Sequence, residues 1–423
     1  MAACNPRYLC GDDGSPLSKC DVSILKADPS LWKISNLPIS YCLARKVEPH
    51  CKLQFSRDIL IAVIICNLCK GAAMIGTLLF QRESTSVTTG DAISSWLSCP
   101  DEITVNQCLQ STTRSINSTS SKSPPGNQAH SVHGWSPVTF QRPRSLRWHQ
   151  AISRRRWFGV LALCTLTLAT AGALLGIAQY NLSKNQDDYV QATGFGAVMS
   201  RTMITVRLPT NGTLGLLANV LVANLPQLIF SCLYLLYNGL FTSMCLAQEY
   251  SNYSFHRKGL RVTSPSGDQR STHWLHLPYI YSVPLLAVSA LLHWSISQSI
   301  FFVGIDTYRD AKLEGSNFGL GFSVQPIILD IVLGGCMLVV LVRMGFRKLY
   351  GKIPLASSNS YAISAACHPP EQDTDAALKP VMWGEVQTGS ESEVGHCCFT
   401  SMDVTAPVEG RMYAGLRKRE EVR

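Results

Sequence analysis

Five long apolar stretches, separated by polar segments, dominate the pattern along the 423-residue chain. About 20 mostly apolar residues cross a bilayer as a helix, and each stretch reaches that length with few charges. Because no water reaches the lipid interior to satisfy free backbone groups, such stretches must be helical. The pattern predicts an all-α fold, a polytopic bundle of five transmembrane helices with a disordered loop and a disordered C-terminal tail. The predicted spans are residues 59–80, 157–180, 214–247, 277–303 and 323–346.

Composition supports this class. The chain is 46% apolar and 15% charged, with a mean hydropathy of +0.11. That charged share is low against the roughly 25% of soluble domains. The formal charge of +9 does not indicate nucleic acid, because the basic clusters abut the apolar stretches, where they set orientation and meet anionic lipid. The expected partner is the lipid bilayer, and no nucleic acid is expected.

Basic residues mark the orientation, since segments rich in Lys and Arg stay in the cytosol. Three segments are rich in them, before the second stretch, after the third and after the fifth: Arg142, Arg144, Arg147, Arg154, Arg155, Arg156, Arg257, Lys258, Arg261, Arg270, Arg343, Arg347, Lys348 and Lys352. The basic residues near the first stretch oppose this count but are outnumbered: Arg45, Lys46, Lys52 and Arg57. The predicted cytosolic segments are 81–156, 248–276 and 347–423, and the external ones are 1–58, 181–213 and 304–322.

Two further features fit this orientation. Asn181 and Asn211 begin glycosylation sequons in a predicted external loop, whereas the sequons at Asn117 and Asn252 fall on the cytosolic side and should stay bare. The predicted external N-terminal segment holds five cysteines for which an oxidising compartment would allow disulfides: Cys4, Cys10, Cys20, Cys42 and Cys51. Five is an odd number, so one thiol is left over or pairs elsewhere.

The predicted external position of the N-terminal segment requires a way for it to cross the membrane. Residues 1–20 are polar and lack the apolar core of a signal peptide. We expect at least one further span upstream in the native protein or its close relatives. The alternative is that the first span alone inserts with its N-terminus outside.

The polar segments show no sustained helical or strand periodicity. Residues 111–145 are rich in Ser, Thr, Pro and Asn, which is typical of a disordered linker. Residues 354–423 carry Pro369, Pro370 and scattered acids, and they predict a mostly unstructured tail. No internal repeat is visible, so the inverted halves of many transporters are not indicated.

Several segments resemble a family of uncharacterised fungal integral-membrane proteins. They are 221–227, 237–242, 269–272, 291–294, 297–301 and 363–370, and the similarity runs from about Pro38 to Gly415. Members of that family usually carry a further N-terminal domain of unknown function, which this sequence lacks. The family has no assigned activity, so the resemblance implies a membrane protein without implying a function.

Polar residues inside the predicted spans form a candidate cluster of Lys70, His293 and Asp330. A charge at mid-bilayer costs at least about 2.5–3.5 kcal/mol, so such residues usually face the bundle and find partners. A pair between Lys70 and Asp330 with His293 nearby requires the first and fifth spans to touch. The alternative is that Lys70 snorkels towards the interface and Asp330 already lies in it.

Two other spans carry packing signals. The third contains Pro226, which removes a backbone hydrogen bond and predicts a kinked helix. In the second, Gly172 and Gly176 form a small-residue face that suits close helix contact, within the protein or between copies.

No catalytic motif, cofactor motif or closed metal-ligand set is present in the sequence. The pair Cys66 and Cys69 and the pair His273 and His276 lack further ligands, and no nucleophile elbow or phosphate loop occurs. The predicted function is therefore that of a non-catalytic membrane organiser or sensor, not an enzyme, with the plasma membrane favoured over internal membranes. The alternative is a transporter or channel that uses the intramembrane polar residues.

Overall fold

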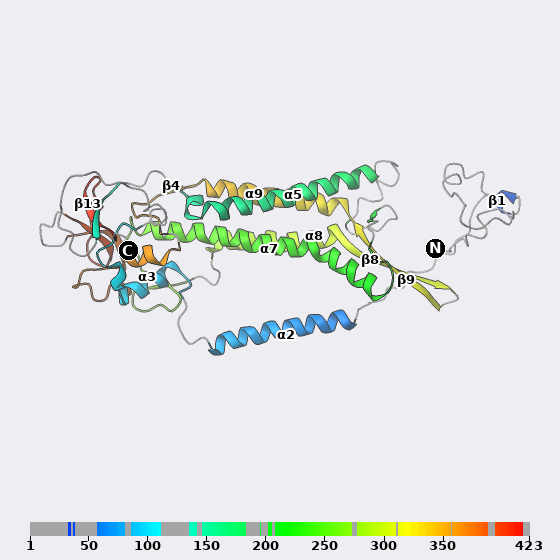
Figure 1. The fold of residues 1–423 in the computed structure, drawn as a ribbon, viewed down its shortest axis with the longest axis horizontal. Coiled ribbons are helices and arrows are strands. Elements are labelled where there is room, and N and C mark those ends of the chain that lie inside the picture. The colour runs from blue at the N-terminus through cyan, green and yellow to red at the C-terminus, as the bar shows by residue number, and fades with distance from the viewer. Residues whose placement is uncertain are drawn as a thin grey trace, which may run out of the picture. The chain divides into compact units, whose positions relative to one another are not determined.

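The computed structural model describes residues 33–34, 37–38, 57–80, 86–110, 135–141, 146–182, 195, 202–204, 208–272, 277–309, 312–356, 358–387 and 394–417 (Figure 1). The chain divides into two compact units, residues 1–84 and 85–423. The first unit contains strands β1 (Lys33–Ile34) and β2 (Leu37–Pro38), which pair antiparallel, and helix α2 (Arg57–Phe80). The five N-terminal cysteines and Asn117 lie outside the described residues.

The second unit contains four long helices: α5 (Arg154–Leu182), α7 (Gly212–Asn252), α8 (Tyr279–Ser299) and α9 (Val324–Gly345). Together with α2, these make five helices that are long and apolar enough to cross a membrane, as predicted. Helix α8 is shorter than the predicted span, which ran to residue 303, because a strand begins at Ile300. Helix α7 continues through Pro226 as one element of 41 residues.

The four helices of the second unit form a ring, here called the bundle. Helix α9 packs against α5 and α8, and α7 packs against the same two helices. Large apolar side chains remain exposed on the outer faces, among them Leu166 at 64%, Leu235 at 68% and Val339 at 65%. Such extensive apolar exposure is normal for a surface that faces lipid and rare for one that faces water.

One end of the bundle carries a small antiparallel sheet, here called the hairpin sheet. Its strands are β5 (Met203–Ile204), β8 (Ile300–Arg309) and β9 (Lys312–Phe322), in the order β5–β9–β8. Strand β8 follows α8 directly and β9 leads into α9 (Figure 1). A side chain at Gly321 would overlap the ring of Phe301, which lies opposite it in the ladder. The all-α prediction missed these strands because Ile300–Val303 continue the apolar run of α8.

The other end of the bundle carries a folded region, here called the polar domain. Its elements are α3 (Thr89–Ser98), η4 (Glu102–Thr104), β3 (Trp135–Thr139), β6 (Arg261–Val262), β7 (Arg270–Ser271), α10 (Ser360–Ala365), η8 (Ala376–Leu378), β11 (Met382–Val386), β12 (His396–Thr400) and β13 (Met412–Arg417). Between it and the bundle lie β4 (Leu146–Arg147), η6 (Trp148–Ala151) and β10 (Lys348–Leu349). The three sequence segments that are rich in Lys and Arg thus meet at one end (Figure 1).

The core of the polar domain corrects the prediction of an unstructured tail. Trp383, Phe399 and Tyr413 are at most 1% exposed and belong to one apolar cluster. Strand β11 pairs with β12, and β13 pairs with β3, so that Tyr413 lies opposite Val138. These strands have five or six residues each, and side chains such as Phe399 are buried against Tyr250 and Tyr253, which lie far away in the chain. Local periodicity therefore gave no sign of them, and the described part of the predicted linker, residues 135–141, likewise contains a strand, β3 (Trp135–Thr139).

Candidate functional site

A pocket of about 300 Å³ lies where the bundle meets the polar domain. Its walls come from the last turns of α7, the turn that follows α7, strands β6 and β7, the start of α8, η6 and the segment after α9. The lining residues are Trp148, Cys245, Leu246, Gln248, Glu249, Asn252, Tyr253, Lys258, Arg261, Arg270, Pro278, Tyr281 and Arg347. We call this cavity the junction pocket.

Charge is distributed unevenly over the junction pocket. Among the described residues that line it, four side chains are cationic and one, Glu249, is a carboxylate, which gives a surplus of three positive charges. A concave site with one sign of charge concentrates ligands of the opposite sign, because low-dielectric walls focus the field. The electrostatics of the pocket therefore favour an anion.

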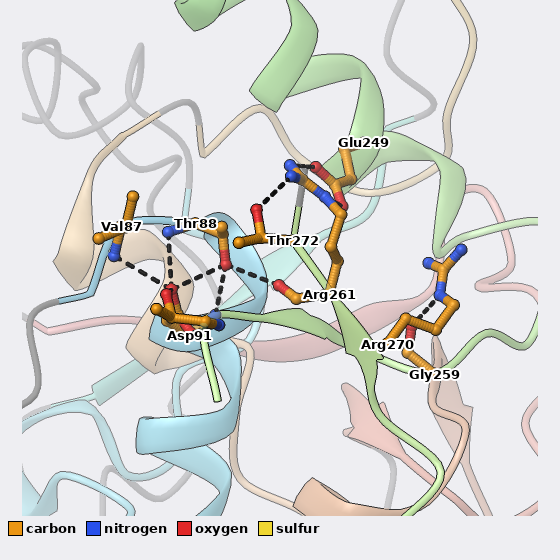
Figure 2. A network of polar contacts seen from close by, with 9 residues as sticks. Val87, Thr88, Asp91, Glu249, Gly259, Arg261, Arg270 and Thr272 are labelled. Carbon is orange, nitrogen blue, oxygen red and sulfur yellow. Dashed lines mark hydrogen bonds and ion pairs between the residues drawn. The ribbon is translucent and has the colours of Figure 1, made fainter. Parts of the chain in front are cut away.

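The carboxylate of Glu249 is held by Arg261 in a two-pronged ion pair (Figure 2). The Nε and Nη2 atoms of Arg261 donate to the two carboxylate oxygens at 2.8 and 2.5 Å, and Nη1 donates to the Thr272 hydroxyl at 2.9 Å. The hydrogen bonds from the Arg261 guanidinium to Glu249 raise the pKa of Arg261. Arg261 is 9% exposed, so this pair fixes strand β6 against the end of α7 and neutralises the one acid among the described residues that line the pocket.

Helix α3 supports β6 from the other side. Thr88 caps α3, with its hydroxyl accepting from the amide of Asp91 at 3.0 Å and donating to the carbonyl of Arg261 at 2.6 Å (Figure 2). The Asp91 carboxylate accepts from the amide of Thr263 at 2.7 Å. Burial pushes the pKa of Asp91 up, but hydrogen bonds from Thr263 and Thr88 outweigh it, and the pKa lies below its usual value. The backbone that carries Arg261 is thereby held from both sides.

The other three cations of the pocket keep donors in reserve. Arg270 uses Nε to donate to the carbonyl of Gly259 at 3.0 Å, and its terminal nitrogens point away from that bond (Figure 2). Arg347 lies 4.9 Å from the ring centroid of Trp148 and donates to the Tyr281 hydroxyl at 3.2 Å. Lys258 pairs with Val381 through its backbone, which leaves its side chain at the pocket wall.

The hydroxyl of Tyr253 is the unsatisfied polar group of the site. The side chain is 1% exposed and lines the pocket, with Arg270 and the backbone of Arg261 as the donors near its oxygen, yet within the described parts of the chain no group accepts its proton. Burial raises the pKa of Tyr253 to about 12, and Glu249 adds to the rise while Arg270 opposes it. The hydroxyl therefore stays protonated at neutral pH and is available as a donor. A buried polar group without a partner costs about 1–3 kcal/mol, which a bound acceptor would recover.

The predicted intramembrane cluster is spread over both units. Lys70 lies on α2 in the first unit, so its pairing with Asp330 stays a prediction. His293 packs edge-to-face on Phe230 of α7, with 4.8 Å between ring centroids. Asp330 instead lies close to Ser295 and Ser299 of α8, with one carboxylate oxygen buried and unpartnered among the described residues.

The two sequons of α7 lie at opposite ends of that helix. Asn211 directly precedes α7 and is exposed, whereas Asn252 is its last residue and lines the junction pocket. The Asn252 side chain accepts from Gln248 at 2.7 Å. Asn181 falls in the last turn of α5. At Gly172 and Gly176 an added side-chain carbon would meet nothing within 4 Å, so this face is open in the second unit.

A second group of titratable side chains lies in the core of the polar domain, around Cys108, His396 and Cys397. The hydrogen bond with Cys397 is the main reason that the pKa of Cys108 falls to about 5. Burial alone would lower the pKa of His396, but contacts with Cys108 and Cys398 raise it to about 10. Over the described ranges, no set of three His, Cys, Asp or Glu side chains has a geometry that would hold a metal ion.

The basic residues of the junction pocket were noted in the sequence, but the pocket itself was not predicted. Lys258, Arg261, Arg270 and Arg347 were counted as marks of orientation, and their convergence depends on the turn after α7 and on the pairing of β6 with β7. The spacing of Glu249 and Arg261 gave no local signal, because the chain reverses direction between them.

Comparison with known proteins identifies a family whose function is unknown. Residues 114–413 match the family model described as Domain of unknown function (DUF8419), and the chain belongs to this family. No curated protein and no solved structure matches the chain. The matched range covers the bundle, the junction pocket and most of the polar domain, and it begins after α2.

Proposed function

We propose that this DUF8419 protein is a non-catalytic membrane organiser or sensor, in which α7 couples the bundle mechanically to the polar domain. The observation that carries the proposal is the course of α7, which runs from the hairpin sheet into the core of the polar domain as one helix. A rigid element packed at both ends transmits a displacement because packed cores do not deform continuously.

The contacts at the polar end of α7 are close and varied. Tyr250 and Tyr253 pack edge-to-face on Phe399, with ring centroids 5.5 and 5.7 Å apart. The amide of Trp383 donates to the carbonyl of Tyr253 at 3.0 Å, which ties strand β11 to the turn after α7. The Ser251 hydroxyl donates to the carbonyl of Tyr350 at 2.5 Å. Movement of α7 would therefore move β11 and β12 with it.

The proposal extends to sidedness and location. The polar domain lies in the cytosol and the hairpin sheet outside, which the positive-inside rule supports. The resemblance to fungal integral-membrane proteins supports a multi-pass protein, and we favour the plasma membrane. Self-association through Gly172 and Gly176 is part of the same proposal, supported by the open space beside both residues.

Hydrogen exchange followed by mass spectrometry on the purified full chain tests the coupling. Phe399→Ala removes the ring between Tyr250 and Tyr253, and we expect faster exchange in the polar domain and also along α7 inside the bundle. Val408→Ala is the control, because Val408 belongs to the same domain and is 55% exposed. If Phe399→Ala changes exchange in the polar domain while α7 is unaffected, the two regions are independent and the sensor proposal fails.

The alternative is a transporter or channel, and Asp330 supports it. A carboxylate with an unpartnered oxygen beside Ser295 and Ser299 is the type of group that binds protons or cations within a bundle. Proteoliposomes that hold a pH-sensitive dye test this alternative. Proton or monovalent-cation flux that is present for the wild type and lost in Asp330→Asn would favour transport over the sensor function.

A further inference from the structure

We propose that the junction pocket binds the phosphate group of an anionic ligand at the membrane surface. The ligand would be the input of the proposed sensor, so the inference rests on that function for its meaning. The binding itself is argued from the pocket alone, from its charges, its unpaired donor and its position.

The donor set fits a phosphate. Arg270, Arg347 and Lys258 line the pocket with nitrogens beyond those used in the bonds described above. Guanidinium groups match the oxygens of a phosphate with paired hydrogen bonds, and an ammonium adds a point charge. A phosphate monoester carries close to two negative charges at neutral pH, which the surplus of three positive charges would balance.

The hydroxyl of Tyr253 is the independent sign of a ligand. It is buried, it lines the same pocket, and among the described residues nothing accepts its proton. A phosphate oxygen held by Arg270 would provide the missing acceptor, because Arg270 and Tyr253 line the same cavity.

The position of the pocket points to the membrane surface. Its walls include the ends of α7 and α9 and the start of α8, with Trp148 and Tyr281 among the lining residues. Aromatic side chains of this kind concentrate where the bilayer meets water, and basic pockets between helix ends bind lipid headgroups on the cytosolic side. Leu246 and Pro278 supply apolar wall for the first carbons of an ester.

Binding is tested with the full chain, using two sources of the same chemistry. In detergent, inorganic phosphate is the probe, and the thermal unfolding midpoint is measured against phosphate concentration. In nanodiscs, phosphatidylcholine alone is compared with phosphatidylcholine containing phosphatidic acid. Stabilisation by phosphatidic acid only would identify a lipid headgroup, whereas equal stabilisation by inorganic phosphate would identify a soluble phosphate. Both outcomes support the inference, and no stabilisation by either probe overturns it.

Pocket variants decide whether the effect is specific. Arg270→Gln and Lys258→Gln should each weaken binding about tenfold, because each removes a charged donor. Arg343→Gln is the matched control, since it removes one positive charge from the last turn of α9, where the residue is exposed and does not line the pocket. Equal weakening in all three variants would mean non-specific attraction and would overturn the inference.

Tyr253→Phe keeps the test decisive if an arginine variant fails to fold. The substitution removes only the unsatisfied hydroxyl, so the ligand-free midpoint should hold or rise while the stabilisation by phosphate decreases. An unchanged response to phosphate in Tyr253→Phe would contradict the role of this hydroxyl. Failure of binding and failure of the sensor function are distinguishable, because the exchange experiment on Phe399→Ala uses the protein without ligand.

Discussion

The two ends of the four-helix bundle are covered by different structures, the hairpin sheet at one end and the polar domain at the other. At the hairpin sheet, aromatic side chains pack on one another, as in the stacked pair Phe302 and Phe318 with 5.7 Å between ring centroids. At the polar end, charged side chains add to the apolar packing, such as Arg257, which donates to the carbonyls of Ser401 and Met402. The basic residues that mark orientation in the sequence are thus also structural residues of one end.

The basic residues of the polar end have two different roles, which a count of Lys and Arg along the sequence does not distinguish. Arg261 and Arg257 are committed to partners inside the fold, whereas Lys258 and Arg270 face the junction pocket. The positive-inside rule treats all four as equivalent, since it counts charges near the membrane and not their contacts. Only the contacts tell which of them can meet a ligand.

The largest expected effect concerns the side of the membrane on which each end of the bundle lies. Helix α7 has 41 residues and at about 1.5 Å per residue is roughly 60 Å long, twice the hydrocarbon thickness of about 30 Å. We expect a glycan on Asn211 and none on Asn252, an all-or-none difference visible by mass spectrometry of the native protein. Asn252 is also bound to Gln248 in the pocket. A glycan on Asn252 would reverse the orientation.

The next prediction concerns the ion pair that defines the polar end. Arg261→Gln leaves the Glu249 carboxylate without its partner, and the pair has side chains only 11% and 22% exposed. Removing one member of a buried pair costs about 3 kcal/mol or more, so the unfolding midpoint in detergent should fall by several degrees. The double variant with Glu249→Gln should recover part of the loss.

An exposed pair provides the contrast for that measurement. Lys379 and Asp375 lie 3.8 Å apart with side chains 50% and 61% exposed, and Asp375→Asn should cost less than about 1 kcal/mol. A loss for Arg261→Gln as small as that for Asp375→Asn would mean that charge at this end serves orientation alone.

The membrane spans could be predicted from the sequence, whereas the polar domain could not. The spans were predictable because length and hydrophobicity are local properties, and all five predicted ranges begin and end within five residues of the observed helices. The polar domain was not, because β13 must meet β3 more than 270 positions away, and Trp383 is buried in a cluster drawn from segments far apart in the chain. The residues of the junction pocket were visible as charges, and their convergence required the fold.

A glycine substitution tests how closely α3 packs on the polar end. A side-chain carbon at Gly90 would overlap the backbone of Arg261, which cannot move without disturbing its pair with Glu249. Gly90→Ala should therefore lower stability by about 1–3 kcal/mol. Gly159→Ala in α5 is the matched control, since an added carbon there meets nothing within 4 Å and the residue lies outside the proposed self-association face. Equal effects of the two substitutions would show that α3 is not docked on β6.

The smallest expected effect is a dependence of the polar domain on acid, carried by Asp373. Its carboxylate accepts from Thr400 Oγ1 at 2.5 Å, from Ser401 Oγ at 2.5 Å and from the Ser401 amide at 2.7 Å. Burial raises the pKa of Asp373, but the hydrogen bonds from Ser401 and Thr400 lower it by more, so the pKa in the folded protein lies below its usual value. A group with a depressed folded pKa stabilises the protein above its unfolded pKa, near 4, and this stabilisation is lost as the pH falls through the folded value.

Asp373→Asn isolates that contribution. At neutral pH the variant should be less stable by about 1–2 kcal/mol, because an amide accepts these hydrogen bonds more weakly than a carboxylate. As the pH falls below about 4, where the unfolded chain binds the proton first, the difference should decrease, and it should approach zero below the folded pKa of Asp373. Exchange measured in strand β12 and in the hairpin sheet over this range distinguishes the two ends, since Asp373 contacts only the former through Thr400. A difference that stays constant with pH would show that the Asp373 carboxylate contributes no more to the fold when charged than when neutral.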